Sequence, residues 1–148
     1  MTVTFFGHRN TPSDIGEPAE KLLMQLIEED GADDFLVGSE GNFDRMIYAK
    51  LKKLQKKYPQ IKVKIVPAHM PTSMPSTARE RENFSDTVLP EEIAVSHPRY
   101  AINKRNEWMI SRADTVVTYV QGVTGGAAKY KQYAEKKGKT VINLADLG

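Results

Sequence analysis

DTVVTYVQGVTGGAAKY, residues Asp114–Tyr130, is the stretch that decides the fold. It begins with an apolar, β-branched run, Thr115–Val120, which predicts a short buried strand. A glycine turn, Gly122–Gly126, follows, and a helical pattern then runs from Ala127 to about Lys137. This order of strand, glycine loop and helix is typical of an open α/β sheet that presents the backbone N–H groups of a helix start to an anionic ligand.

The glycines of this loop support two interpretations. Gly125 and Gly126 lack the Cβ atoms that keep a phosphate away from the backbone. On this interpretation the ligand-binding turn comprises Gly122, Thr124, Gly125, Gly126 and Ala127. On the other interpretation the glycines only allow a tight turn. The loop alone does not decide between the two.

Composition is that of an ordinary globular chain. With 148 residues, of which 40% are hydrophobic and 27% charged, we expect one domain spanning residues 1–148. The net charge of +2 gives no strong overall attraction to nucleic acid. There is no cysteine, which excludes disulfides and thiolate chemistry, and the three histidines lack metal-ligand spacing, so we expect no metal. The first apolar stretch is too short for a signal peptide or a membrane span, which predicts a cytoplasmic protein with no membrane partner.

The rest of the chain alternates between the two periodicities. Strand patterns cover Thr2–Phe6, Phe35–Val37, Ile61–Val66 and Thr140–Leu144, and helical patterns cover Glu17–Glu29, Asn42–Lys57 and Arg99–Arg112. This alternation predicts an α/β fold with a mostly parallel sheet and helices on both faces. Lysines alternate with apolar residues in the third strand, which places that strand at an edge. Right-handed crossovers put the first three strands side by side and the Val116 strand on the other side of the first, which creates a topological switch point.

Residues 67–98 are the least regular stretch. They contain Pro71, Pro75 and Pro90, a charged segment around Arg79–Glu82 that suits a short helix, and Glu92–Val95, which suits a short strand. A segment of this length with little regular structure is either a lid over a ligand or a mobile connection. Its arginines either reach a phosphate or are only solvated.

Three of the predicted strands end in glycine-containing turns. These are Gly7-His8-Arg9, Gly38-Ser39-Glu40-Gly41 and Gly122–Gly126. In a parallel sheet the three turns converge on one rim, which favours a cleft for a phosphate or a nucleotide. His8 is either a ligand contact or a packed turn residue. The chain has no GxxxxGK[ST] motif, no GxGxxG after the first strand and no nucleophile elbow, so the usual nucleotide and hydrolase signatures are absent.

One predicted helix carries a polar residue on its apolar stripe. The stripe runs Ile102, Asn106, Met109, Ala113, and Asn106 is the exception. A buried amide needs hydrogen-bond partners. Asn106 is therefore either a satisfied structural asparagine or a residue that points into a site, with Asn103 and Arg105 beside it.

These motifs, in this order, resemble the SLOG superfamily, Rossmann-like proteins that include the LOG phosphoribohydrolases and DprA. The resemblance rests on Gly7-His8-Arg9, on Arg105-Asn106-x-x-Met109, on Ala113-Asp114 and on Gly125-Gly126. It extends over nearly the whole chain and is strongest over residues 99–144. The pattern is most similar to the YpsA-like branch. The resemblance implies a Rossmann-like three-layer sandwich, a nucleotide-type ligand at the glycine loop and a homodimer.

The resemblance also bears on catalysis. LOG enzymes cleave the N-glycosidic bond of a nucleoside monophosphate with an arginine and a glutamate. Arg105 matches the arginine, whereas the glutamate position holds Lys129 or Gln132, depending on the alignment. Hydrolysis of this kind would need another acid such as Glu40 as general base.

Three functions follow as hypotheses. The first is binding of a nucleotide or an ADP-ribose-like ligand, as in a sensor, with phosphate at Gly125–Ala127, charge neutralised by Arg9 and Arg105, and ribose held by Ser39 and Glu40. The second is an N-glycosidase, with Glu40 and Arg105 as catalytic residues. The third is DprA-like binding of single-stranded DNA, which we rank last because the lysines are dispersed and the net charge is small. On these grounds nucleic acid is not expected as a partner, and no cofactor beyond the nucleotide ligand is expected.

Overall fold

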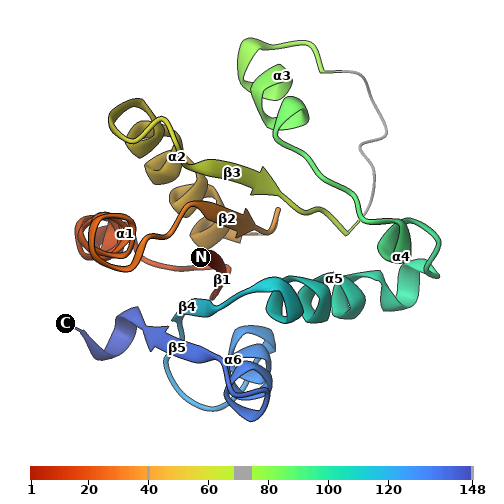
Figure 1. Ribbon diagram of the computed structural model, residues 1–148. Helices are drawn as coiled ribbons and strands as arrows, with labels where there is room; N and C mark the ends of the chain where they lie inside the picture. Colours follow the sequence, from red (N-terminus) through yellow and green to blue (C-terminus); the bar gives the residue numbers. More distant parts are fainter. Residues whose placement is uncertain (40, 69–74, 148) are drawn as a thin grey trace.

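The computed structural model describes residues 1–39, 41–68 and 75–147. Its centre is a five-stranded, wholly parallel sheet with the strand order β3-β2-β1-β4-β5 (Figure 1). The strands are β1 (Thr2–Gly7), β2 (Asp34–Val37), β3 (Lys62–Ile65), β4 (Thr115–Tyr119) and β5 (Thr140–Asn143). This order confirms the predicted α/β fold. The chain winds outward from β1 in one direction and then returns to its other side, so the switch point lies between β1 and β4.

Helices cover both faces of the sheet and complete three layers (Figure 1). They are α1 (Gly16–Asp30), α2 (Gly41–Lys57), α3 (Ala78–Ser85), α4 (Glu91–Ala94), α5 (Pro98–Arg112) and α6 (Gly126–Lys136), with short 3-10 turns at Ser13–Ile15 and Leu144–Asp146. α1 and α2 pack on one face, whereas α4, α5 and α6 pack on the other. The central strands are consequently buried on both sides: all five residues of β4 are buried.

α1 shows how the sequence pattern forms one of these layers. Its buried residues recur at helical spacing: Ala19, Leu22, Leu23, Leu26 and Ile27. The helix ends at Gly31, whose φ of 71° is the left-handed conformation that glycine adopts without a Cβ penalty. A sequence stripe and a stop signal thus agree, and the boundary lies where the pattern predicts it.

Residues 75–98 are more regular than expected. The predicted short helix is confirmed as α3, which starts at a capping box between Thr77 and Glu80. The predicted strand at Glu92–Val95 is wrong, because this segment forms α4, a single helical turn that buries Ile93. One apolar side chain is enough to anchor one turn of helix, whereas a strand would need a free edge beside it. β3 is an outer strand as predicted, and its edge carries one parallel bridge from Ile65 to Thr87.

One position on the predicted stripe of α5 is also wrong. Asn106, Met109 and Ala113 are buried, but Ile102 is 41% exposed. The preceding residue, Ala101, takes the inward position instead. α5 is therefore rotated so that its buried side includes Arg105, which carries a charge into the layer between α5 and the sheet.

Candidate functional site

A cleft of about 390 Å³ opens at the carboxyl ends of β1 and β2 and at the start of α6. We call it the rim cleft. Its lining residues are Phe5, Phe6, Gly7, His8, Arg9, Gly38, Asp44, Ile102, Asn103, Arg105, Asn106, Met109, Gly126, Ala127, Lys129 and Tyr130. The cleft lies at the switch point, where open parallel sheets bind their ligands. The whole of the first predicted glycine turn, Gly38 of the second and Gly126 of the third line this cavity.

Gly7 and Gly38 are needed because other side chains occupy the space where a Cβ would lie. A Cβ at Gly7 would lie 2.2 Å from Cγ of Phe43, so Gly7 lets the aromatic ring of α2 pack under the end of β1. A Cβ at Gly38 would lie 2.8 Å from Oδ2 of Asp44 and 3.7 Å from Cζ of Arg105. Gly38 therefore lets the Asp44 carboxylate approach the end of β2, whereas the Arg105 guanidinium beside it lies at an ordinary contact distance. Both glycines shape the cleft through packing.

Asp44 and Arg105 are buried charges at the floor of the rim cleft. Asp44 is 9% exposed and Arg105 is 4% exposed. Nε of Arg105 donates a hydrogen bond to Oδ1 of Asn106 at 3.0 Å. The two predicted roles of Asn106 are thus not exclusive, since its amide orients Arg105 and also lines the cleft. Buried charges persist only where neighbouring groups compensate them, so this corner of the molecule is a built polar site.

The glycine loop contributes the open start of α6. Gly125 is the N-cap residue, with φ of 97°, and no side chain caps the helix. No side chain or distant backbone atom of the described residues comes within 4 Å of a Cβ built on Gly125 or Gly126, so the space beside the helix start is open. Gly126 and Ala127 line the rim cleft, whereas Gly122, Thr124 and Gly125 are not among its lining residues. The end of the loop, at the helix start, therefore faces the cleft.

His8 joins two of the turns. Its Nε2 accepts a hydrogen bond from the backbone N–H of Gln121 at 2.9 Å, and its ring lies edge-on to Tyr119. Its own backbone N–H donates to the carbonyl of Tyr119 at 3.3 Å. His8 thus packs against the end of β4 and also lines the cleft. The turn after β1 is tied to the turn after β4 on either side of the switch point.

Arg9 is tied to the start of α2. Its carbonyl accepts from the backbone N–H of Asn42 at 3.0 Å, and a Cβ at Gly41 would lie 2.9 Å from its Cα. Gly41 has φ of 79°, so glycine is required both by its conformation and by this close approach. The exposed Arg9 side chain is thereby held at the mouth of the cleft. Glu40, the proposed general base, lies outside the described residues.

Four polar cleft residues were not assigned a role from sequence: Asp44, Asn103, Lys129 and Tyr130. The hydroxyl of Tyr130 donates to Oδ1 of Asn103, which joins α6 to α5 across the cleft. Asp44 carried a usable signal, because it lies in the first turn of the helix that follows the second glycine turn. The other three could not be found in this way, since their approach depends on how α5 and α6 pack.

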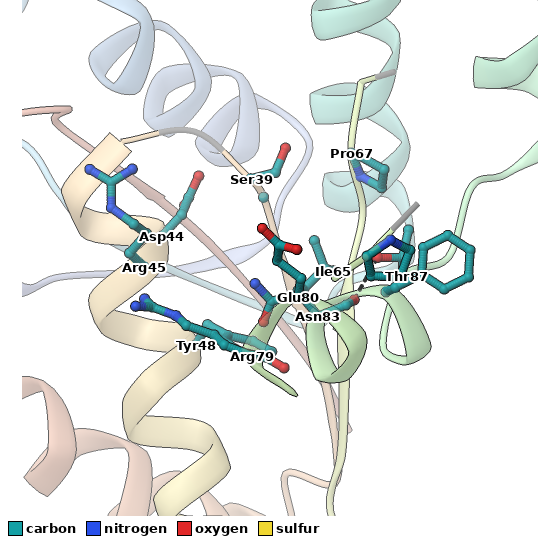
Figure 2. A pocket seen from close by; sticks show the side chains of 13 residues that line it. Ser39, Asp44, Arg45, Tyr48, Ile65, Pro67, Arg79, Glu80, Asn83 and Thr87 are labelled. Carbon is teal, nitrogen blue, oxygen red and sulfur yellow. Dashed lines mark hydrogen bonds between the residues drawn. The ribbon is translucent and has the colours of Figure 1, made fainter. Parts of the chain in front are cut away.

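A second cavity, which we call the α3 pocket, lies between α2, the end of β3 and α3 (Figure 2). It has a volume of about 470 Å³. Its lining residues are Gly38, Ser39, Asp44, Arg45, Tyr48, Ile65, Pro67, Pro75, Arg79, Glu80, Asn83, Phe84 and Thr87. Gly38 and Asp44 line both cavities. Ser39, predicted as a ligand contact, therefore lies in the α3 pocket and not in the rim cleft.

Polar contacts hold the outer wall of the α3 pocket in place. The hydroxyl of Tyr48 donates to Oδ2 of Asp86 at 2.7 Å, and Nζ of Lys52 lies 3.0 Å from the same oxygen. Burial, together with the Asp86 carboxylate, raises the pKa of the Tyr48 phenol above its usual value, so the hydroxyl remains a donor. The segment after α3 is thus fastened to α2 and to the edge of β3.

Comparisons with known proteins support the fold. The sequence matches no protein-family model and has no significant match among curated proteins. Among solved structures it resembles DNA processing protein A (DprA) from Streptococcus pneumoniae, with a TM-score of 0.69 and 15% identity over 95% of this chain. It also resembles DNA processing protein A from Helicobacter pylori, with a TM-score of 0.64 and 14% identity over 95% of this chain. The H. pylori structure was determined to explain how that protein binds single-stranded DNA. The chain spans 48% and 63% of the lengths of these two proteins.

The comparisons overturn the expectation about nucleic acid, and they support the family resemblance for the fold alone. The small net charge led us to expect no nucleic-acid partner. That expectation is wrong, because the H. pylori protein, which has this fold, binds single-stranded DNA. Net charge failed as a guide because a binding groove depends on where cations gather and not on their sum. The Rossmann-like, DprA-related resemblance is confirmed for the fold. No helix among the described residues is long and apolar enough to cross a membrane.

Proposed function

We propose that this protein binds the sugar-phosphate backbone of single-stranded DNA in the rim cleft. The observation that carries the proposal is the meeting of an uncapped helix start with cationic side chains. Gly126 and Ala127 at the start of α6 share the cleft with Arg9, Arg105 and Lys129, whereas Asp44 is the only carboxylate among the described residues that line it. Backbone N–H groups at a helix start and nearby cations are the usual means of holding phosphate.

The similarity to DprA supports DNA as the source of that phosphate. The shared fold includes the switch point at which the rim cleft lies, and the H. pylori protein is described as binding single-stranded DNA. Phe6 and Tyr130 also line the cleft, but they stack on each other and are buried, so the proposal rests on phosphate contacts and not on base stacking. Membership in the YpsA-like branch, a homodimer and a cytoplasmic location remain parts of the proposal.

Fluorescence anisotropy with a labelled single-stranded oligodeoxynucleotide, measured over a series of salt concentrations, tests this proposal. Each phosphate contact contributes about 0.7 to the slope of log K against log salt for single strands. Arg9→Ala, a change at an exposed side chain, is expected to lower the affinity and to reduce that slope by about 0.7, and circular dichroism checks that the variant remains folded.

Lys136→Ala is the matched control, because this exposed lysine lies at the far end of α6. It is expected to leave the slope nearly unchanged. Equal losses in the two variants would mean that only overall charge matters. No binding at low salt by the folded wild-type protein would overturn the proposal.

A free nucleotide-derived ligand is the second candidate, and the dimensions of the cleft favour it. A volume of about 390 Å³ falls within the range of small-molecule sites. Asp44, a buried carboxylate beside Arg105, would be the described residue best placed for N-glycosidic hydrolysis, alongside the earlier candidate Glu40.

A thermal-shift screen with mononucleotides, ADP-ribose and NAD, followed by chromatography, separates binding from hydrolysis. Occupancy at about 100 times Kd stabilises by roughly 2.7 kcal/mol. Release of free base that Asp44→Asn abolishes would indicate a hydrolase, and a shift with intact ligand would indicate a binding protein. No shift with any of these ligands would exclude this candidate.

A further inference from the structure

The α3 pocket adjoins the rim cleft. Both cavities are lined by Gly38, directly after β2, and by Asp44 in the first turn of α2, and the α3 pocket extends from there to α3 (Figure 2). At about 470 Å³ it is no smaller than the cleft itself. A ligand that fills the rim cleft therefore has a second cavity beside it, with room for a unit of similar size.

Among the described residues, two arginines and two carboxylates, Asp44 and Glu80, line the α3 pocket, and the arginines are the groups that could hold an anion. Arg45 of α2 and Arg79 of α3 both line it and extend toward the same end in the view of Figure 2. Nη2 of Arg45 donates to Oδ1 of Asn42 at 2.7 Å, an uncharged partner. Arg79 forms no ion pair with any described residue. The two guanidinium groups thus retain donors that suit a phosphate or a carboxylate.

One of the two carboxylates that line the pocket, Glu80, is held by the start of α3. Oε2 of Glu80 accepts from the backbone N–H of Ser76 at 2.7 Å, from its hydroxyl at 2.9 Å and from the backbone N–H of Thr77 at 3.2 Å. These hydrogen bonds, that from the Ser76 backbone first, lower the pKa of Glu80 and keep its charge on the capping box. Glu80 therefore serves the start of α3.

An amide and an aromatic ring complete the pocket. Oδ1 of Asn83 is buried and accepts no hydrogen bond from any described residue. A buried acceptor without a donor is costly, and an N–H group from a ligand would satisfy it once α3, which buries no residue of its own, moves enough to open this atom to the pocket. Phe84, 44% exposed, lines the same pocket and offers a flat apolar face. An N–H donor, a planar ring and an anion together describe a nucleotide.

We propose that the α3 pocket binds a second nucleotide unit of the ligand whose first phosphate lies in the rim cleft. The second phosphate lies between Arg45 and Arg79, and the attached base donates an N–H to Oδ1 of Asn83 with its face on Phe84. This inference rests on the proposed function and deepens it, because it sets the ligand at two or more nucleotides. The linkage is either a phosphodiester, as in a DNA strand, or a pyrophosphate, as in a dinucleotide.

Isothermal titration of the full chain with thymidine 5′-monophosphate and with the dinucleotide pTpT tests the inference. We expect pTpT to bind at least tenfold more tightly than the mononucleotide. A third probe, thymidylate joined to an abasic nucleotide, keeps the second phosphate and removes the second base. NAD serves as the pyrophosphate-linked probe.

Two variants separate the contacts. Arg79→Ala is expected to remove about tenfold of the affinity for pTpT and for the abasic probe, and to leave the mononucleotide unchanged. Asn83→Ala is expected to weaken pTpT alone. Arg81→Ala is the matched control, because Arg81 is exposed on the same helix, donates to the carbonyl of Ser76 and does not line the pocket. Circular dichroism checks that each variant remains folded.

The outcomes separate this inference from the proposed function. If neither the mononucleotide nor pTpT binds, both fall. If the mononucleotide binds and pTpT binds no more tightly, the second unit is wrong and the rim cleft stands. Equal losses in Arg79→Ala and Arg81→Ala would also overturn it. NAD could bind more tightly than the mononucleotide, through Arg79, while pTpT does not. That result would support the second unit and assign a pyrophosphate-linked dinucleotide as the ligand.

Discussion

The rim cleft and the α3 pocket meet at the end of β2, yet their walls are built in different ways. α5, which borders the cleft, buries Ala101, Arg105, Asn106, Met109 and Ile110 against the sheet. α3, which borders the pocket, buries no residue, and polar contacts through Asp86 and Thr87 hold its end. α5, the wall of the rim cleft, is therefore part of the core, whereas α3, the wall of the α3 pocket, is attached to the core only through polar contacts at its end. Segments with few buried apolar contacts open locally at low free energy. We expect the cleft to be preformed and the α3 pocket to be adjustable.

The largest expected effect compares two phenylalanines. Phe43 is completely buried below Gly7, and Phe84 is 44% exposed on α3. Phe43→Ala is expected to lower the free energy of unfolding by about 3–5 kcal/mol, because it leaves a cavity in the core. Phe84→Ala is expected to change it by less than about 0.5 kcal/mol. Urea denaturation measures both. Similar losses would show that α3 is packed as firmly as the cleft wall.

Two asparagines extend the comparison to hydrogen bonds. Oδ1 of Asn143 accepts from the backbone N–H of Val120, and its Nδ2 donates to the carbonyl of Val120, each at 2.9 Å. Asn143→Ala is expected to cost about 2 kcal/mol, since each such bond contributes about 1 kcal/mol. Asn83→Ala is expected to cost far less, because its Oδ1 has no partner among the described residues. Thermal unfolding would contradict this if Asn83→Ala were the more damaging change.

Tyr48 tests whether α3 opens by itself. Tyr48→Phe removes the donor to Asp86 and leaves the Lys52 ion pair. We expect a loss of about 1 kcal/mol in local stability. Amide hydrogen exchange should become faster in α3 while exchange in β4 stays unchanged. If both elements exchanged faster to the same extent, the two walls would unfold as one unit.

The smallest effect is a pH dependence. The pKa of Tyr48 is raised by burial and by Asp86, so the folded state keeps this proton when the unfolded chain has lost it. Its contribution to stability is fully present below the ordinary tyrosine value of 10.0 and falls as the pH rises beyond it. Unfolding free energies at pH 9 and pH 11 should therefore differ more in the wild type than in Tyr48→Phe. An equal decline in both proteins would assign it to other groups.

Much of the fold was predictable because parallel α/β proteins repeat simple local signals. The stripe of α1 with its stop at Gly31 and the apolar run of β4 are legible over a few residues. Connection rules then gave the strand order. The exceptions are just as physical. Glu92–Val95 became a helical turn because one buried side chain suffices for it, and Ile102 turned outward because α5 packs with Ala101 inside.

The candidate site was predictable only where it follows the backbone. Gly7, Gly38 and Gly126 lie at the carboxyl rim because strand ends in a parallel sheet must meet there. The contacts of Gly7 with Phe43 and of Gly38 with Arg105 could not be predicted, because they join residues distant in the chain. Nor could the buried Oδ1 of Asn83 or the Tyr48–Asp86 contact beneath α3. Sequence by itself determined the layers and the rim, since periodicity and turns are local. Only tertiary packing decided which charges and amides face the two cavities.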